Sequence, residues 1–410
     1  MNRNTDQTPG YNAIMPLLRD PVHTLQMQVH CMKLNQRTVE ILNPGQTPVD
    51  VCDLPVYALT KEALLRFPQL FPKYFPMMGA LHIEQVFLLC HGQMISGSGL
   101  PEILKAANLS LLGTSAVVDV NDIKRARYCM QVSVCAMYLK LRDAAESDEL
   151  GKGPFQWLQD RSRTSDMCFY WFMVMRMQLD ILVFIRSMRE GNFNVYVASI
   201  RRLIKWVFVF DHIHYSRWLS IHLFDLMNLE KSDPELYAEM KKGNFSFQKT
   251  ERQFSRMALD QVHEQNNKVI KGVGGASQLM NRGDDSSLIR WETCGPEVAR
   301  IVSEFEETME LKTRTSILQK TDLHMKHHED SPTFRKNYIK DVQNVYDKLQ
   351  CNPFQLEDLT MVNDNAVVFN SDVLSQVKSI EEVGETQFKK FERERLVLCQ
   401  NVSQCHHIQE

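Results

Sequence analysis

Three short clusters of carboxylate and histidine side chains could carry chemistry in this chain of 410 residues. Asp53 ends an apolar run that predicts a short strand, and His82 and Glu84 follow directly after a second such run. The third cluster is the polar stripe of a predicted helix, whose members are spaced by three and four: Asp260, His263, Glu264 and Asn267.

Carboxylates that converge from separate elements can hold Mg²⁺ or Mn²⁺, and two such ions can clamp the entering and leaving oxygens of a phosphoryl transfer. The carboxyl ends of strands are where open α/β sheets place their chemistry. Asp53 and Glu264 are therefore candidate metal ligands, and His82 could bind a metal or orient a phosphate. Accessory roles are assigned to the remaining polar residues of the clusters: Glu84, Asp260, His263 and Asn267.

Structural interpretations compete with these assignments. Asp53 precedes a predicted helix and could serve as its N-cap. His82 could be a hydrogen-bonded histidine of the core. Both alternatives are open at the level of the sequence.

The elements that position these residues begin with a small α/β part. Apolar spacing and Pro/Gly breakers predict, in order, a helix at 24–42, a strand at 48–53, a helix at 57–67, a strand at 74–81 and a helix at 82–95. A polar helix at 257–271 then carries Glu264.

Between these parts the strand signals nearly disappear, and helical segments rich in Met, Phe, Trp and Leu follow one another. We expect them at 121–145, 167–190, 193–211, 215–230 and 234–242. Later helices are expected at 295–312, 335–350 and 372–398. The predicted class is α+β but predominantly helical. The predicted parts are a partial α/β core (1–98), an all-helical insertion (99–256), the glutamate-bearing helix and end of the core (257–312), and a helical C-terminal region with a frayed tail (313–410).

The net charge of −3 excludes a broadly basic surface for gripping nucleic acid, so any DNA-binding surface must be local. The basic residues that we assign to nucleic-acid contacts are Arg201, Arg202 and Lys205. Ten cysteines without a CxxC pair, and a polar N-terminus, predict an intracellular protein of the nucleus or cytoplasm. The apolar stretch 167–185 contains Arg176 and Asp180 four residues apart, which predicts a buried helix with an internal ion pair and not a membrane span.

Longer motifs carry a family resemblance. The segments TPVDVCDLPVYALTKEALLRFP and MMGALHIEQVF resemble the middle of a Mutator-like transposase core, which has an RNase H-like fold. NPGQTPV, GALHIEQ, REGNF, YSRWLSIHL, KGNFSFQKT and DQVHEQNNKVIKGVGGA resemble, over about residues 11–395, an uncharacterised family of transposon-derived proteins of invertebrates.

The resemblance implies a partial RNase H-like core interrupted by the helical insertion. In it, Asp53 would be the second metal-binding carboxylate, Glu264 the third and His82 an active-site accessory. The first aspartate of such a site lies on a first strand that has no counterpart before residue 24, and the family continues beyond the last helix. We therefore expect an incomplete or inactive copy of a Mg²⁺- or Mn²⁺-dependent DNA transposase that needs no nucleotide cofactor. The alternative is a non-catalytic module in which the helical block binds protein or DNA.

Overall fold

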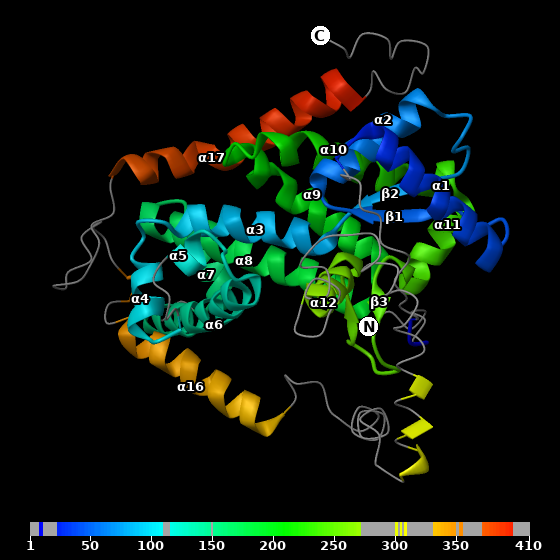
Figure 1. Ribbon diagram of the computed structural model, residues 1–410. Coiled ribbons are helices and arrows are strands. Elements are labelled where there is room, and N and C mark those ends of the chain that lie inside the picture. The colour runs from blue at the N-terminus through cyan, green and yellow to red at the C-terminus, as the bar shows by residue number, and fades with distance from the viewer. Residues whose placement is uncertain are drawn as a thin grey trace. The chain divides into compact units, whose positions relative to one another are not determined.

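The computed structural model describes residues 8–10, 23–109, 115–148, 151–271, 331–349, 352–355 and 371–396, together with 300–301, 304–305 and 307–309. These residues are mostly helical and include a few short strands, which confirms the predicted helix-rich α+β class (Figure 1). Two compact units are distinguished. The first comprises residues 1–81, 188–191 and 239–331, and the second comprises 82–187, 192–238 and 332–410.

The first unit is built around a strand–helix–strand motif. β1 (Val49–Cys52) pairs in parallel with β2 (Phe75–Met78), and α2 (Leu54–Arg66) connects them. α2 begins earlier than predicted because Pro55, which lacks an N–H, fits the first turn of a helix. β2 ends earlier than predicted because α3 already begins at Ala80.

α1 (Leu25–Leu42) covers α2 and matches the predicted helix. Thr24 caps its first turn by accepting a hydrogen bond from the Met27 N–H. Its buried face contributes Met32 to a small apolar core, and Gln28 Nε2 donates to Thr60 Oγ1 of α2 at 2.8 Å. This packing holds α1 and α2 on one another.

The first unit also contains a short hairpin and the glutamate-bearing helix. β3 (Phe247–Gln248) pairs antiparallel with β4 (Arg256–Met257). The buried Arg256 donates to the carbonyls of Gly243 and Ser246, and so fixes the hairpin to the turn η1 (Met240–Asn244). α12 (Leu259–Lys271) follows as predicted.

The second unit is entirely helical among its described residues. Its elements are α3 (Ala80–Ile95, from residue 82), α4 (Leu100–Ala106), α5 (Ser115–Val118), α6 (Ile123–Ser147), α7 (Pro154–Arg161), α8 (Asp166–Glu190, to residue 187), α9 (Phe193–Val209), α10 (Ile213–Ser232), α11 (Pro234–Glu239), α16 (Pro332–Lys348), α17 (Ser371–Phe391) and η3 (Glu392–Leu396). The sequence patterns did not predict α4, α5 and α7, which are too short to show a helical period.

α8 is largely buried within this unit. Among the described residues, α8 is the one helix long and apolar enough to cross a membrane by length and composition, and 67% of its apolar window is buried inside the protein, which favours a core helix. Arg176 and Asp180, predicted to pair with one another, bind partners on other helices: Arg176 pairs with Glu381 of α17, and Asp180 pairs with Arg202 of α9 at 3.2 Å. These ion pairs therefore join helices instead of stabilising one turn of α8.

Two late helices complete the second unit. α16 lies on α6, where Tyr128 Oη donates to Asp341 at 2.7 Å and Tyr338 Oη donates to the Gln131 carbonyl at 3.0 Å. α17 lies along α9 (Figure 1). Most of the predicted helix at 295–312, residues 313–330 and the tail from 397 lie outside the described residues.

Candidate functional site

Asp53 stands directly after β1 and has the capping role that the sequence offered as an alternative. Its Oδ1 accepts a hydrogen bond from the Val56 N–H at 3.2 Å, which satisfies one free donor at the start of α2. The Gly79 N–H donates to the Cys52 carbonyl at 2.8 Å, so the end of β2 lies next to the strand position that precedes Asp53. Asp53 is thus both an N-cap and a carboxylate at the carboxyl edge of the parallel strands.

Asp260 ties α12 to the same edge. Both of its carboxylate oxygens accept from the Leu81 N–H, at 2.9 and 3.1 Å, and the side chain is only 6% exposed. A Cβ atom on Gly79 would lie 2.2 Å from Asp260 Oδ2, so glycine leaves the space that the carboxylate occupies. Asp260, predicted as a site accessory, therefore caps the first turn of α3. The sequence feature associated with this contact is Gly79, which stands directly before the first residue of α3.

The other polar residues of α12 lie differently. His263 and Glu264 are exposed, whereas Asn267 is partly buried. The polar stripe therefore runs from the buried start of α12 onto its surface. Glu264 remains accessible to a ligand, one helical turn beyond Asp260.

His82 and Glu84 belong to the second unit. His82 is partly buried on the first turn of α3. Glu84 is 1% exposed and forms a two-bond ion pair with Arg127 of α6, at 2.5 and 2.7 Å. Both carboxylate oxygens of Glu84 are used in packing α3 on α6, so this residue does not fit the accessory role that we predicted.

The three predicted nucleic-acid contacts separate into two environments. Arg201 and Arg202 are exposed on α9, and Arg202 pairs with Asp180. Lys205 is 7% exposed, and its ammonium binds Glu381 of α17. In this conformation Lys205 is not available to a phosphate.

A polar group that the sequence did not suggest occupies the other face of β1. Asp50 is partly buried and accepts a hydrogen bond from Tyr74 Oη at 3.3 Å, while Asn35 Nδ2 donates to the same hydroxyl at 3.5 Å. Loss of hydration raises the pKa of Asp50, and hydrogen bonds to Cys52, Tyr74 and Gln28 oppose that rise. The alternation of side chains along a strand could have predicted that Asp50 and Asp53 point to opposite faces, since they are three residues apart.

The core of the second unit holds a second polar group. Gln178 Nε2 donates to His91 Nε2 at 2.9 Å and to Ser133 Oγ at 3.0 Å, and Ser133 donates in turn to the Met130 carbonyl. In this arrangement His91 is neutral and carries its proton on Nδ1. Burial lowers the pKa of His91 to about 4.

The described residues contain no group of three or more His, Cys, Asp or Glu side chains placed to hold a metal ion. Asp53 and Glu264 supply the oxygen donors that Mg²⁺ prefers, but only two of them. The donor type of the predicted site therefore fits a divalent cation, and the number of donors does not.

Comparison with known proteins gives a family. A family model described as "Domain of unknown function (DUF8702)" matches residues 126–401, more than half of the chain. The chain belongs to this family. The DUF8702 match includes α8, α9, α12 and α17, hence Glu264 and Lys205, and begins after Asp53 and His82. No curated protein and no solved structure matches the chain.

Proposed function

We propose that this DUF8702 protein derives from a transposase of RNase H-like fold, whose ancestral reaction was metal-dependent cleavage and transfer of DNA strands. The observation that carries the proposal is the hydrogen bond of Asp260 to the Leu81 N–H. It holds the start of α12 at the carboxyl edge of the parallel strands, where Asp53 stands. An active site of this class needs a strand-end aspartate and a helix-borne glutamate at one such edge.

The resemblance at the level of motifs gains a physical basis from the same contact. GALHIEQ contains Gly79 and Leu81, and DQVHEQNNKVIKGVGGA begins with Asp260. These two motifs, distant in the sequence, meet at one hydrogen bond. Their joint presence therefore reflects one structural requirement.

The proposal is an incomplete or inactive copy. Asp53 and Glu264 would hold Mg²⁺ or Mn²⁺, which in the ancestral reaction activates a nucleophile and stabilises the leaving oxygen. The first aspartate of such a site has no position among the described residues that the sequence or the strands suggest. We derive no reaction step from two ligands alone.

Metal binding and DNA nicking by the purified chain test this proposal separately. We expect weak Mn²⁺ binding, measured by electron paramagnetic resonance, that is reduced in both Asp53→Asn and Glu264→Gln, without nicking of supercoiled plasmid. Asp122→Asn removes the charge of another helix-capping aspartate, and Glu230→Gln removes that of another exposed glutamate, so they are the matched controls.

Two results would contradict the proposal. Unchanged Mn²⁺ binding in both site variants would remove Asp53 and Glu264 as ligands. Metal-dependent nicking that disappears in Asp53→Asn would show an active enzyme instead of an incomplete copy.

A non-catalytic interaction module is the second candidate. Its support is that Glu84, Asp260 and Lys205, three residues predicted to serve a site, are used in contacts that hold the fold. Binding of DNA in the presence of EDTA, with Mn²⁺ binding indifferent to Asp53→Asn, would favour this function.

For either function we propose an intracellular location. The cysteines of the described part are free thiols, several of them buried, as is usual for proteins in reducing compartments.

A further inference from the structure

Glu381 of α17 lies against cationic side chains from two helices. Arg176 of α8 reaches its two oxygens at 3.1 and 3.2 Å, and Lys205 of α9 binds Oε1. The ammonium of Lys205 is nearly enclosed, and a buried charge is stable only when it is paired. Asp180 of α8 carries a second negative charge near the same cations, and α17 provides the carboxylate that both of them bind directly.

Aromatic rings accompany the anion on the same helix. The rings of Phe388 and Phe391 lie 5.9 and 6.1 Å from the ring of Phe208 of α9. Glu381 and Phe388 are separated by about 10 Å along the helix axis, at 1.5 Å per residue. α17 thus offers α9 a negative group followed by two rings that meet Phe208 in tilted and edge-on arrangements.

Single-stranded nucleic acid also presents negative groups, its phosphates, next to aromatic rings, its bases. Proteins that bind it use cationic side chains for phosphates and aromatic side chains on which bases stack. On α9, Arg201, Lys205 and Phe208 are spaced by four and three, so they follow one face of the helix. Arg202 lies on the flank of this face with 60% of its side chain exposed.

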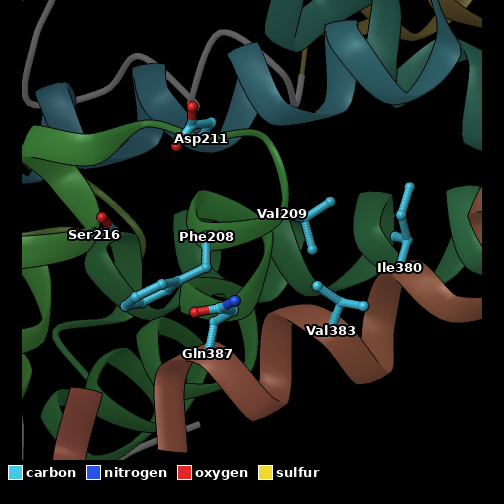
Figure 2. Close-up of a pocket in the computed structure, with 7 residues that line it drawn as sticks. All are labelled: Phe208, Val209, Asp211, Ser216, Ile380, Val383 and Gln387. Carbon is cyan, nitrogen blue, oxygen red and sulfur yellow. The ribbon is translucent and has the colours of Figure 1, made fainter. Parts of the chain in front are cut away.

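α17 packs closely against α9 at one point and leaves a hollow at another. A Cβ atom on Gly384 would lie 2.6 Å from the Lys205 carbonyl, so α17 can approach α9 this closely only with glycine at 384. A hollow of about 290 Å³ lies beside this contact and is lined by residues of α17 and of the turn from α9 to α10. Figure 2 shows Val209 and Val383 facing one another across it. Part of the apolar face of α17 is therefore not packed, which favours a helix that can be displaced.

We propose that the face of α9 beneath α17 binds single-stranded DNA, with Arg176 and Lys205 on a phosphate and Phe208 stacked on a base, and that α17 masks this surface. The choice of DNA as ligand rests on the proposed function, while the masking rests on the contacts of Glu381, Gly384 and Phe388. Release of α17 would free Lys205 and Arg176 beside Arg201 and Arg202, which are already exposed.

The test measures binding of a fluorescent single-stranded oligonucleotide to the full chain in EDTA. Because apparent affinity scales with the fraction of competent molecules, we expect a gain of about tenfold in Gly384→Val, whose new side chain strikes the backbone of α9. Glu381→Gln should also bind more tightly and keeps the shape of the side chain. Glu382→Gln is the matched control, since it changes the net charge equally on the same helix at an exposed position.

Combination variants assign the site. In the Glu381→Gln background, Lys205→Gln and Phe208→Ala should each remove the gain, and the affinity should fall steeply with salt. Hydrogen exchange of amides 379–396 reports whether α17 has been released in each variant.

Release of α17 without a gain in affinity would overturn the inference. An equal gain in oligonucleotide affinity in Glu382→Gln would also overturn the inference. So would an equal gain in affinity for a polyglutamate peptide, which would identify an acidic protein as the ligand. None of these measurements depends on a metal, so the inference can fail while Mn²⁺ binding at Asp53 and Glu264 stands, and the reverse.

Discussion

Asp260 depends on the glycine at position 79, because its carboxylate fills the space that a side chain there would need. The Leu81 N–H is one of the donors that a helix start leaves without an intrahelical partner. Asp260 supplies that partner from a distant part of the chain. A single residue pair thereby fixes α12 to the strand–helix–strand motif.

The pair can be tested by a double-mutant cycle. Asp260→Ala should lower the free energy of unfolding by about 1–3 kcal/mol, because the buried N–H loses its acceptor. Gly79→Ala should cost about 1–3 kcal/mol through crowding. The double variant should cost less than the sum, because removal of the carboxylate relieves the clash. Strict additivity in denaturant titrations would contradict the contact.

Asp50 should weaken the fold at neutral pH. Burial raises its pKa above the ordinary value of 3.8, so the native state binds more protons than the unfolded state between that value and the native pKa. Stability therefore falls as the pH rises through this window, and the loss is complete above it. Asp50→Asn should raise the melting temperature at pH 7. Glu62→Gln, an equal charge change on α2 at a side chain that is 40% exposed and pairs with Arg66, should not. A lower melting temperature in Asp50→Asn would show that its ionised form is stabilised.

His91 should have the opposite dependence on pH. Its native pKa of about 4 lies below the ordinary value of 6.5, so the native state binds fewer protons between these values. The contribution of His91 is fully present above pH 6.5 and is lost as the pH falls toward 4, by about 3 kcal/mol in all. His91→Gln should flatten the acid limb of the stability profile. An unchanged acid limb would mean that other groups control it.

Individual helices dock through identifiable side chains, and α16 illustrates this at the scale of the element. Tyr338 stacks on Phe334 and donates to the Gln131 carbonyl, while Tyr128 of α6 binds Asp341. Tyr338→Ala should therefore speed hydrogen exchange in amides 333–348 by loosening α16 from α6. Ile339→Ala, on the same helix with 68% of its side chain exposed, should not. Equal exchange in both variants would show that α16 does not depend on this ring.

The element scale is also where sequence reasoning succeeded most. Long helices such as α6, α8 and α9 carry an apolar period over several turns, and Asn43-Pro44-Gly45 marks the end of α1. The short α4, α5 and α7 have too few turns for a period. Side-chain partners were predicted poorly, because the partners of Asp260, Lys205 and Arg176 lie on elements distant in the sequence. Whether a carboxylate caps a helix or binds a ligand depends on its partners in the folded structure.

At the scale of the whole molecule, the two units should respond to acid in opposite senses. Asp50 belongs to the first unit and His91 to the second. On going from pH 7 to pH 4, close to the ordinary pKa of Asp50, amides of α1 and α2 should gain protection, and amides of α6 and α9 should lose it, after correction for intrinsic exchange rates. Parallel changes in both units, measured by hydrogen exchange with mass spectrometry, would contradict this expectation.

The link between Leu81 and Asp260 also sets an order of events during synthesis. The two residues are 179 positions apart. At about 5–20 residues per second, the ribosome needs about 10–35 s to travel from one to the other. During that interval the nascent strand–helix–strand motif carries an uncapped helix start and must wait, or be held by a chaperone, while most of the second unit emerges. Slow codons placed between the two motifs would lengthen this exposure, and the yield of soluble protein would measure its cost.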